Sequence, residues 1–140
     1  MLAAVLEAKL SPVVVREFED PEPSPGEVIV KLSYSALNHR DVWIQKGMYA
    51  GLKYPIIVGS DGAGEIIAVG DDVSKSELGR MVLLNPSLNW GSRQQAQNRD
   101  YKILGLPDNG TLAEYITLPF HRCYQISDGL SIRGAAALPL

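Results

Sequence analysis

Apolar and polar residues alternate in short runs along most of this chain, and glycines, prolines or polar turns separate the runs. Such a pattern is typical of β-strands. In the segment 27–37, Lys31 and Ser33 alternate with apolar neighbours and point to the same face, which predicts a long strand. Further strands are expected at residues 2–9, 13–18, 54–58, 62–70, 79–84, 111–118 and 122–126.

Two segments carry the signals of a helix start. Residues 38–46 begin with Asn38, a good N-cap, and Asp41 follows three positions later, where a carboxylate suits the exposed N–H groups of a first turn. Gly47 is expected to end this helix. A second helix is expected to start around Ser131, with Ser131 or Asp128 near its cap. Because the strands follow one another through turns without regular helical crossovers, the pattern predicts an antiparallel sandwich or barrel.

One stretch departs from this alternation. Residues 85–110 are mostly polar and show no regular period. A loop of that length in a compact domain is usually functional or forms an excursion with its own structure. Trp90 lies within it and is expected to be a half-buried anchor.

The composition is that of an ordinary globular domain, with 140 residues of which 46% are hydrophobic and 21% are charged. The formal net charge of -3 disfavours nucleic acid as a partner. No apolar run approaches the roughly 20 residues that a membrane helix needs, and the N-terminus lacks the pattern of a signal peptide. The single cysteine, Cys123, cannot form an internal disulfide, which favours a cytoplasmic protein.

Few residues suggest chemistry by their spacing alone. The glycines at 59–64 follow the order G-x-x-G-x-G and lead into a strand, whereas a dinucleotide fingerprint needs G-x-G-x-x-G and a helix. A turn with close backbone packing is the better interpretation. His39, His121, Asp61 and Cys123 lack the spacing of a zinc site, and no G-x-S-x-G elbow is present.

An ordered series of short motifs runs through almost the whole chain. It comprises Pro25-Gly26-Glu27-Val28, Asn38-His39-Arg40-Asp41, Gly47-Met48-Tyr49, the run from Pro55 to Ile66, Val69-Gly70, Gly79-Arg80-Met81-Val82 and the run from Gly110 to Tyr115. This series resembles the N-terminal, GroES-like domain of medium-chain dehydrogenases/reductases. The resemblance implies a mainly β fold, a partly open β-barrel with one or two short helices. Residues 1–130 would form this catalytic domain, and 131–140 would start the helix leading to a nucleotide-binding domain that this chain lacks.

The departures from the zinc-containing members of that superfamily are informative. Asn38 stands where those members place a cysteine ligand, and Ser60-Asp61 stands where they place a histidine–glutamate pair. The region 85–110 contains none of the four cysteines of their structural zinc lobe. An amide and a hydroxyl are poor zinc ligands. The resemblance therefore narrows to the zinc-free branch that is similar to quinone oxidoreductases and enoyl reductases.

That branch implies a zinc-independent, NADPH-dependent oxidoreductase that transfers a hydride to a quinone or an activated alkene. By resemblance, Asn38 and Tyr49 are the catalytic candidates, as donors to the substrate oxygen, and Trp90 and Asp41 are candidates for the substrate cleft. A plain N-cap role for Asn38 and a structural role for Asp41 remain alternatives. No residue of this chain is expected to bind metal or to hold the NADP(H), and the choice between NADP and NAD belongs to the missing domain.

The expected partner is a small-molecule substrate, without nucleic acid or membrane, and the full-length protein is a candidate homodimer. The isolated 140 residues are expected to be inactive and to bind NADPH negligibly. Two other functions stay open: a non-catalytic GroES-like binding or assembly module, and a zinc-type alcohol dehydrogenase with atypical ligands.

Overall fold

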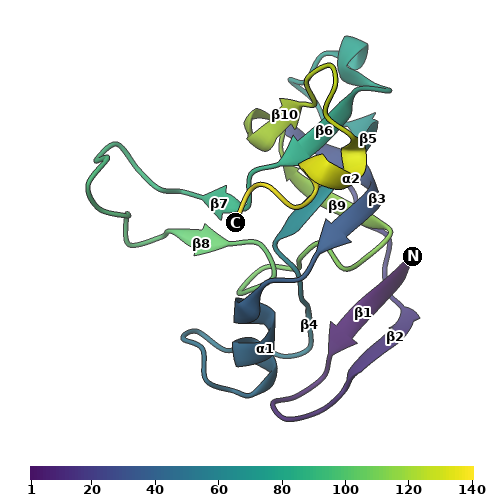
Figure 1. Ribbon diagram of the computed structural model, residues 1–140. Coiled ribbons are helices and arrows are strands. Elements are labelled where there is room, and N and C mark those ends of the chain that lie inside the picture. Colours follow the sequence, from purple (N-terminus) through teal and green to yellow (C-terminus); the bar gives the residue numbers. More distant parts are fainter.

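A computed structural model describes residues 1–140 as mainly β-strands, arranged in three antiparallel sheets with two short α-helices (Figure 1). The sheets do not close into a complete barrel. The expectation of a mainly β, partly open domain with one or two short helices is therefore confirmed. None of the helices has the length and apolar character needed to cross a membrane.

The three-stranded sheet has the order β2-β1-β4, with bounds Val13–Glu17, Leu2–Leu6 and Ile56–Ile57. In β1 the buried residues include Val5 and Leu6, which pair with both neighbouring strands. The outer strand β2 carries a partly exposed arginine and an exposed glutamate, a common way to keep an edge strand from pairing further.

The larger sheet has the order β10-β6-β5-β3-β9. Its strands run over Cys123–Gln125, Met81–Leu84, Asp61–Val69, Glu27–Ala36 and Tyr115–Pro119. The long strand predicted around Lys31 and Ser33 is β3, and both side chains are exposed as expected. Strand β3 is central because it pairs with β5 on one side and with β9 on the other.

Strand β9 begins later than the residues 111–118 predicted for it. The preceding residues pair with the turn after β4 instead, because the backbone N–H groups of Gly110, Thr111 and Leu112 donate to the carbonyls of residues 57–59 at 2.7–3.0 Å. These bonds hold the 110–112 segment against the chain that leads into β5. They therefore help to place Ser60 and Asp61.

Helix α1 (His39–Gln45) has Asn38 as its N-cap, and Gly47 follows its end with a φ of 71°. Both features agree with the sequence prediction. Helix α2 (Ile132–Ala135) starts after the N-cap Ser131, as predicted, and packs alanines against Ala63 of β5. Two short 3-10 helices, η1 (Lys75–Glu77) and η2 (Phe120–Arg122), complete the elements.

The polar stretch 85–110 forms a lobe with its own two-stranded sheet, β7 (Ser87–Leu88) and β8 (Lys102–Ile103). It extends to the left in Figure 1. Of the two interpretations given for this stretch, the structure shows the excursion with its own structure. Leu88 and Leu104 are buried at its base, in the same core as the five-stranded sheet.

A second, smaller core lies beneath α1. It consists of Leu6, Ile44, Ile56, Val58 and Leu106, with Tyr49 among the partly buried side chains packed against it. This core joins the helix to the three-stranded sheet and to the base of the lobe. It fixes the position from which the N-terminus of α1 faces the start of β5.

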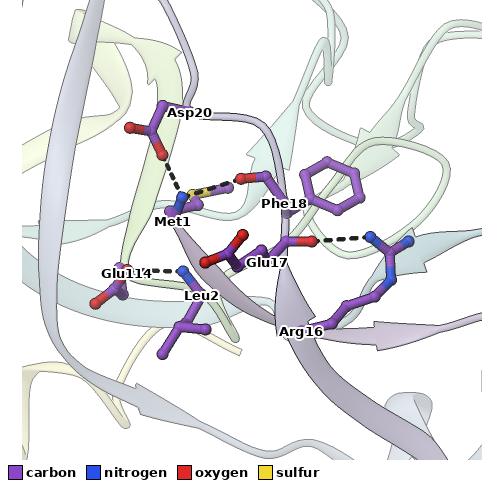
Figure 2. Close-up of polar contacts among 7 residues, drawn as sticks. All are labelled: Met1, Leu2, Arg16, Glu17, Phe18, Asp20 and Glu114. Carbon is purple, nitrogen blue, oxygen red and sulfur yellow. Dashed lines mark hydrogen bonds and ion pairs between the residues drawn. The ribbon is translucent and has the colours of Figure 1, made fainter.

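Polar contacts tie the N-terminal residues to both sheets (Figure 2). The Met1 ammonium donates to the Phe18 carbonyl at 3.0 Å and to the carboxylate of Asp20. The hydrogen bond to Asp20 raises the pKa of that ammonium. The N–H of Leu2 donates to Glu114 at 2.7 Å, which links β1 to the segment before β9.

Candidate functional site

Asp41 fastens the start of α1 to the chain entering β5. It is only 6% exposed. One carboxylate oxygen accepts the backbone N–H of Asn38 at 2.8 Å, and the other accepts the N–H of Gly59 at 3.1 Å. Bonds from N–H groups to a carboxylate are stronger than bonds to a neutral acceptor. Because both oxygens are engaged inside the fold, the geometry favours the structural role of Asp41 over a contact with substrate.

The Asn38 side chain reaches from the start of α1 to the start of β5. Its Nδ2 donates to the Oδ2 of Asp61 at 3.0 Å. One N–H of the amide is thereby held, and the other is left for a further acceptor. Asn38 occupies the N-cap position of α1 and is half-buried, so its side-chain amide is partly accessible.

Asp61 is 1% exposed and is the first residue of β5. Its Oδ1 has no hydrogen-bond partner, and Asn38 is the side-chain donor to its Oδ2. Burial raises the pKa of this carboxyl, an effect that the bond from Asn38 partly opposes. The Thr111 hydroxyl donates to the backbone carbonyl of Asp61 at 2.8 Å and holds the strand start in place.

Arg40 is a buried cation next to these residues, with 8% of its surface exposed. Its Nη1 donates to the Ser60 hydroxyl at 2.7 Å and to the Leu104 carbonyl at 2.6 Å. Its Nη2 lies 3.5 Å from the carbonyl of Leu106. The guanidinium therefore connects α1, the residue before β5 and the base of the lobe.

Tyr49 completes the group from the other side of Arg40. The Nε of Arg40 donates to the Tyr49 hydroxyl at 3.4 Å, and the guanidinium carbon lies 5.0 Å from the centre of the ring. The hydrogen bond and the contact with the ring both place the positive charge of Arg40 next to the Tyr49 side chain. We call Asn38, Arg40, Asp41, Tyr49, Ser60 and Asp61 the polar cluster.

The structure brings Asn38 and Tyr49 into one polar cluster but leaves Trp90 outside it. Trp90 lies in the lobe, 38% exposed, where its ring contacts Tyr101 edge-on at 5.2 Å. Its Nε1 donates to the carbonyl of Arg93 at 3.1 Å. In Figure 1 the tip of the lobe projects away from α1. The local contacts explain Trp90 as an anchor of the lobe, and the expectation that it lines a cleft with Asn38 gains no support.

The glycines of 59–64 serve close packing, as the sequence predicted. A Cβ on Gly64 would lie 2.0 Å from the Lys31 carbonyl oxygen, and one on Gly62 would lie 2.8 Å from Leu32. No real side chain tolerates such contacts. Because these residues enter strand β5 rather than a helix, they do not form a phosphate-binding turn.

One cavity of the structure lies away from the polar cluster. It has a volume of about 580 Å³ between the N-terminal segment, β9 and the base of the lobe, and none of Asn38, Tyr49, Trp90 and Asp41 lines it.

The comparisons with known proteins agree with the geometry. Residues 24–128 match the family model described as the alcohol dehydrogenase GroES-like domain. The chain belongs to this family. It is thereby a member of the medium-chain dehydrogenase/reductase superfamily, and the resemblance found in the sequence is confirmed at that level.

Individual relatives differ in their described chemistry. The chain is 38% identical over 125 residues to a zinc-type alcohol dehydrogenase-like protein of Schizosaccharomyces pombe, covering 88% of this chain and 36% of that protein. It is 39% identical over 83 residues to an acryloyl-coenzyme A reductase of Metallosphaera sedula, covering 59% and 25%. A crystal structure of an NAD-dependent alcohol dehydrogenase superposes with a TM-score of 0.90 at 38% identity, covering 100% of this chain and 43% of that one.

The chain thus spans well under half the length of these members of the GroES-like family. Within it, no group of three or more His, Cys, Asp or Glu side chains is arranged to hold a metal ion. His39 stacks on Trp43 with ring centres 5.6 Å apart, and Cys123 packs against the main core. Burial raises the pKa of the Cys123 thiol to about 12.

Sequence reasoning missed Arg40 as a site residue. The motif Asn38-His39-Arg40-Asp41 is visible in the sequence, but the burial of Arg40 was not predicted from it. A signal was available, because Arg40 and Ile44 are four residues apart on α1 and so share one helix face. An arginine above a buried isoleucine predicts either a partner charge or a buried contact, and no acidic residue occupies the same face one turn later.

Proposed function

We propose that this chain is the substrate-side domain of a zinc-independent oxidoreductase that uses NADP(H) to reduce an activated alkene or a quinone. The observation that carries the proposal is the pair of half-buried neutral donors, Asn38 and Tyr49, beside the buried guanidinium of Arg40. Preorganised donors of this kind stabilise negative charge that develops on an oxygen. The acryloyl-coenzyme A reductase among the relatives supports a reductase of this class.

The donor set argues against zinc. Zinc in proteins takes thiolate, imidazole and carboxylate ligands. Asp61 offers a carboxylate, but Asn38 offers an amide, and the Ser60 hydroxyl already accepts a bond from Arg40 at 2.7 Å. A guanidinium at that distance from a ligand position repels a second cation. The residues of the polar cluster therefore do not fit a zinc ion.

The proposed reaction needs only polar stabilisation from this chain. A bound reduced nicotinamide would supply the hydride to the β-carbon of an activated alkene and would itself be oxidised. The π-electron pair moves onto the carbonyl oxygen, where Asn38 and Tyr49 donate hydrogen bonds. The α-carbon then takes a proton from solvent. This chain's own contribution would be the hydrogen bonds of Asn38 and Tyr49 to that oxygen.

The test uses the full-length protein that contains this chain. Oxidation of NADPH is followed with an α,β-unsaturated ketone and with a quinone, before and after treatment with a chelator, and bound metal is measured by mass spectrometry. We expect turnover that survives the chelator and substoichiometric zinc. Asn38→Ala is expected to lower kcat by about 10²-fold. The exposed Gln97→Ala is the matched control and should retain the wild-type rate.

A zinc-type alcohol dehydrogenase is the second candidate, because one relative and one superposed structure carry alcohol dehydrogenase names. It predicts stoichiometric zinc, loss of activity with the chelator and oxidation of an alcohol. Those three results together would refute the zinc-independent reductase.

A further inference from the structure

Arg40 is a buried cation without a counter-charge. The ion pairs of the structure involve the Met1 ammonium and the side chains of Arg16, Arg80 and Lys102, but not Arg40. Its acceptors are the backbone carbonyls and hydroxyls described above. Taking a charge out of water without an opposite charge opposes folding. A feature that destabilises the fold in this way calls for a functional explanation.

The bond between Arg40 and Tyr49 determines what the phenol can do. The Nε–H of Arg40 donates to the phenol oxygen, so that oxygen acts as the acceptor in this contact. A phenol has one hydrogen of its own. No group of this chain accepts it, and it is therefore left for a partner outside the chain. The Tyr49 ring is held at the same time, because it packs on the core beneath α1.

We propose that Arg40 is a positioning residue that turns the Tyr49 hydroxyl into a fixed donor and places a permanent positive charge behind it. The charge favours substrates whose oxygen becomes negative as the hydride adds, which is the enolate oxygen of an α,β-unsaturated carbonyl compound. This inference rests on the proposed function and names the substrate class of the same site. A donor backed by a fixed charge takes the part that a metal ion plays elsewhere, without any metal ligand.

A purely structural role for Arg40 predicts different behaviour. As a link between Ser60 and the Leu104 carbonyl, Arg40 would act independently of Tyr49. Any change in kcat on its loss would then be the same whether or not the Tyr49 hydroxyl is present. Arg40→Lys separates the two roles. The lysine ammonium keeps a cation for Ser60 and Leu104, but it has no Nε–H for Tyr49.

The test is a double-mutant cycle in the full-length protein, with Arg40→Lys, Tyr49→Phe and the double variant, assayed with NADPH and an α,β-unsaturated ketone. Each single change is expected to lower kcat by about 10²-fold, because each removes or misplaces one donor. The double variant should be no slower than Tyr49→Phe alone, within a factor of about three. Arg16→Lys is the control, since Arg16 also stands over an aromatic ring, 5.2 Å from the centre of Phe18, and should leave kcat unchanged.

Losses that multiply in the double variant, to about 10⁴-fold, would overturn the proposal, as would a wild-type kcat in Arg40→Lys. A second readout does not depend on activity, and it therefore applies to variants that fold but are inactive. In the ¹⁵N spectrum of the protein, the Nε–H signal of Arg40 should shift on Tyr49→Phe and stay in place on Arg16→Lys. An unmoved signal in Tyr49→Phe refutes the contact. Absence of any alkene or quinone reduction by the wild type refutes the proposed function instead, whatever the spectrum shows.

Discussion

Replacing Asp41 by Asn tests whether this residue holds the fold together. The two side chains have the same shape, but the amide offers one oxygen where the carboxylate offers two. The N–H groups of Asn38 and Gly59, now 2.8 and 3.1 Å from carboxylate oxygens, would compete for that oxygen, and one of them would face an NH₂ group. The change therefore removes an acceptor inside a site that is 6% exposed.

The expected loss follows from these two bonds. A buried N–H left without an acceptor costs about 1–3 kcal/mol, and the bond that survives loses its charged acceptor, at a cost of about 1 kcal/mol. We expect the free energy of unfolding of Asp41→Asn to fall by about 2–4 kcal/mol. Urea denaturation followed by tryptophan fluorescence measures it, with the midpoint shifting down by about 1 M or more at an unchanged slope.

The matched control is Asp128→Asn, because Asp128 is exposed and its side chain has no hydrogen-bond partner. It should stay within about 0.5 kcal/mol of the wild type. A similarly small change in Asp41→Asn would refute the structural role. If KM then rose in the full-length enzyme without a loss of stability, Asp41 would belong to the substrate cleft, as first expected from the resemblance.

Three further predictions concern single side chains. Burial raises the pKa of the Asp61 carboxyl above 3.8, so its ionisation opposes folding. Asp61→Asn should therefore become more stable relative to the wild type as the pH rises from below 3.8 to neutrality. A difference in urea midpoints that does not change with pH contradicts this. The free energy of unfolding of Gly64→Ala should fall by about 3 kcal/mol or more, because the added Cβ would lie 2.0 Å from the Lys31 carbonyl oxygen. A urea midpoint close to that of the wild type would refute the clash. With its pKa raised to about 12, the Cys123 thiol should react with a disulfide reagent at mildly alkaline pH far more slowly in the native than in the urea-unfolded protein, and equal rates would refute the burial argument.

The local elements were predictable where a local rule acts. The N-cap Asn38, the helix end at Gly47 and the strand around Lys31 all follow from residue type and spacing over a few positions. The late start of β9 was not predictable in this way. The backbone of residues 110–112 pairs with 57–59, more than fifty positions earlier, and no periodicity records such a contact.

The candidate site also has a part that the sequence predicted and a part that it did not. The motif around Asn38 and the replaced ligand positions Ser60 and Asp61 could be read from the sequence through the family resemblance. Trp90 was expected near them because it lies in the long polar stretch, whereas its contacts in the structure are with Tyr101 and the Arg93 carbonyl of the same lobe. Position along the chain says little about position in space once a stretch forms its own small sheet.

The sequence by itself determined the class of domain, the strand and helix segments, and the absence of cysteine and histidine at the positions where zinc-containing relatives place them. Only the tertiary structure decided that Arg40 is buried, that it reaches Ser60 and the Leu104 carbonyl, and that it meets the Tyr49 hydroxyl. The physical reason is that a guanidinium finds its acceptors across three segments distant in sequence. Their meeting depends on how the helix, the strand and the lobe pack together.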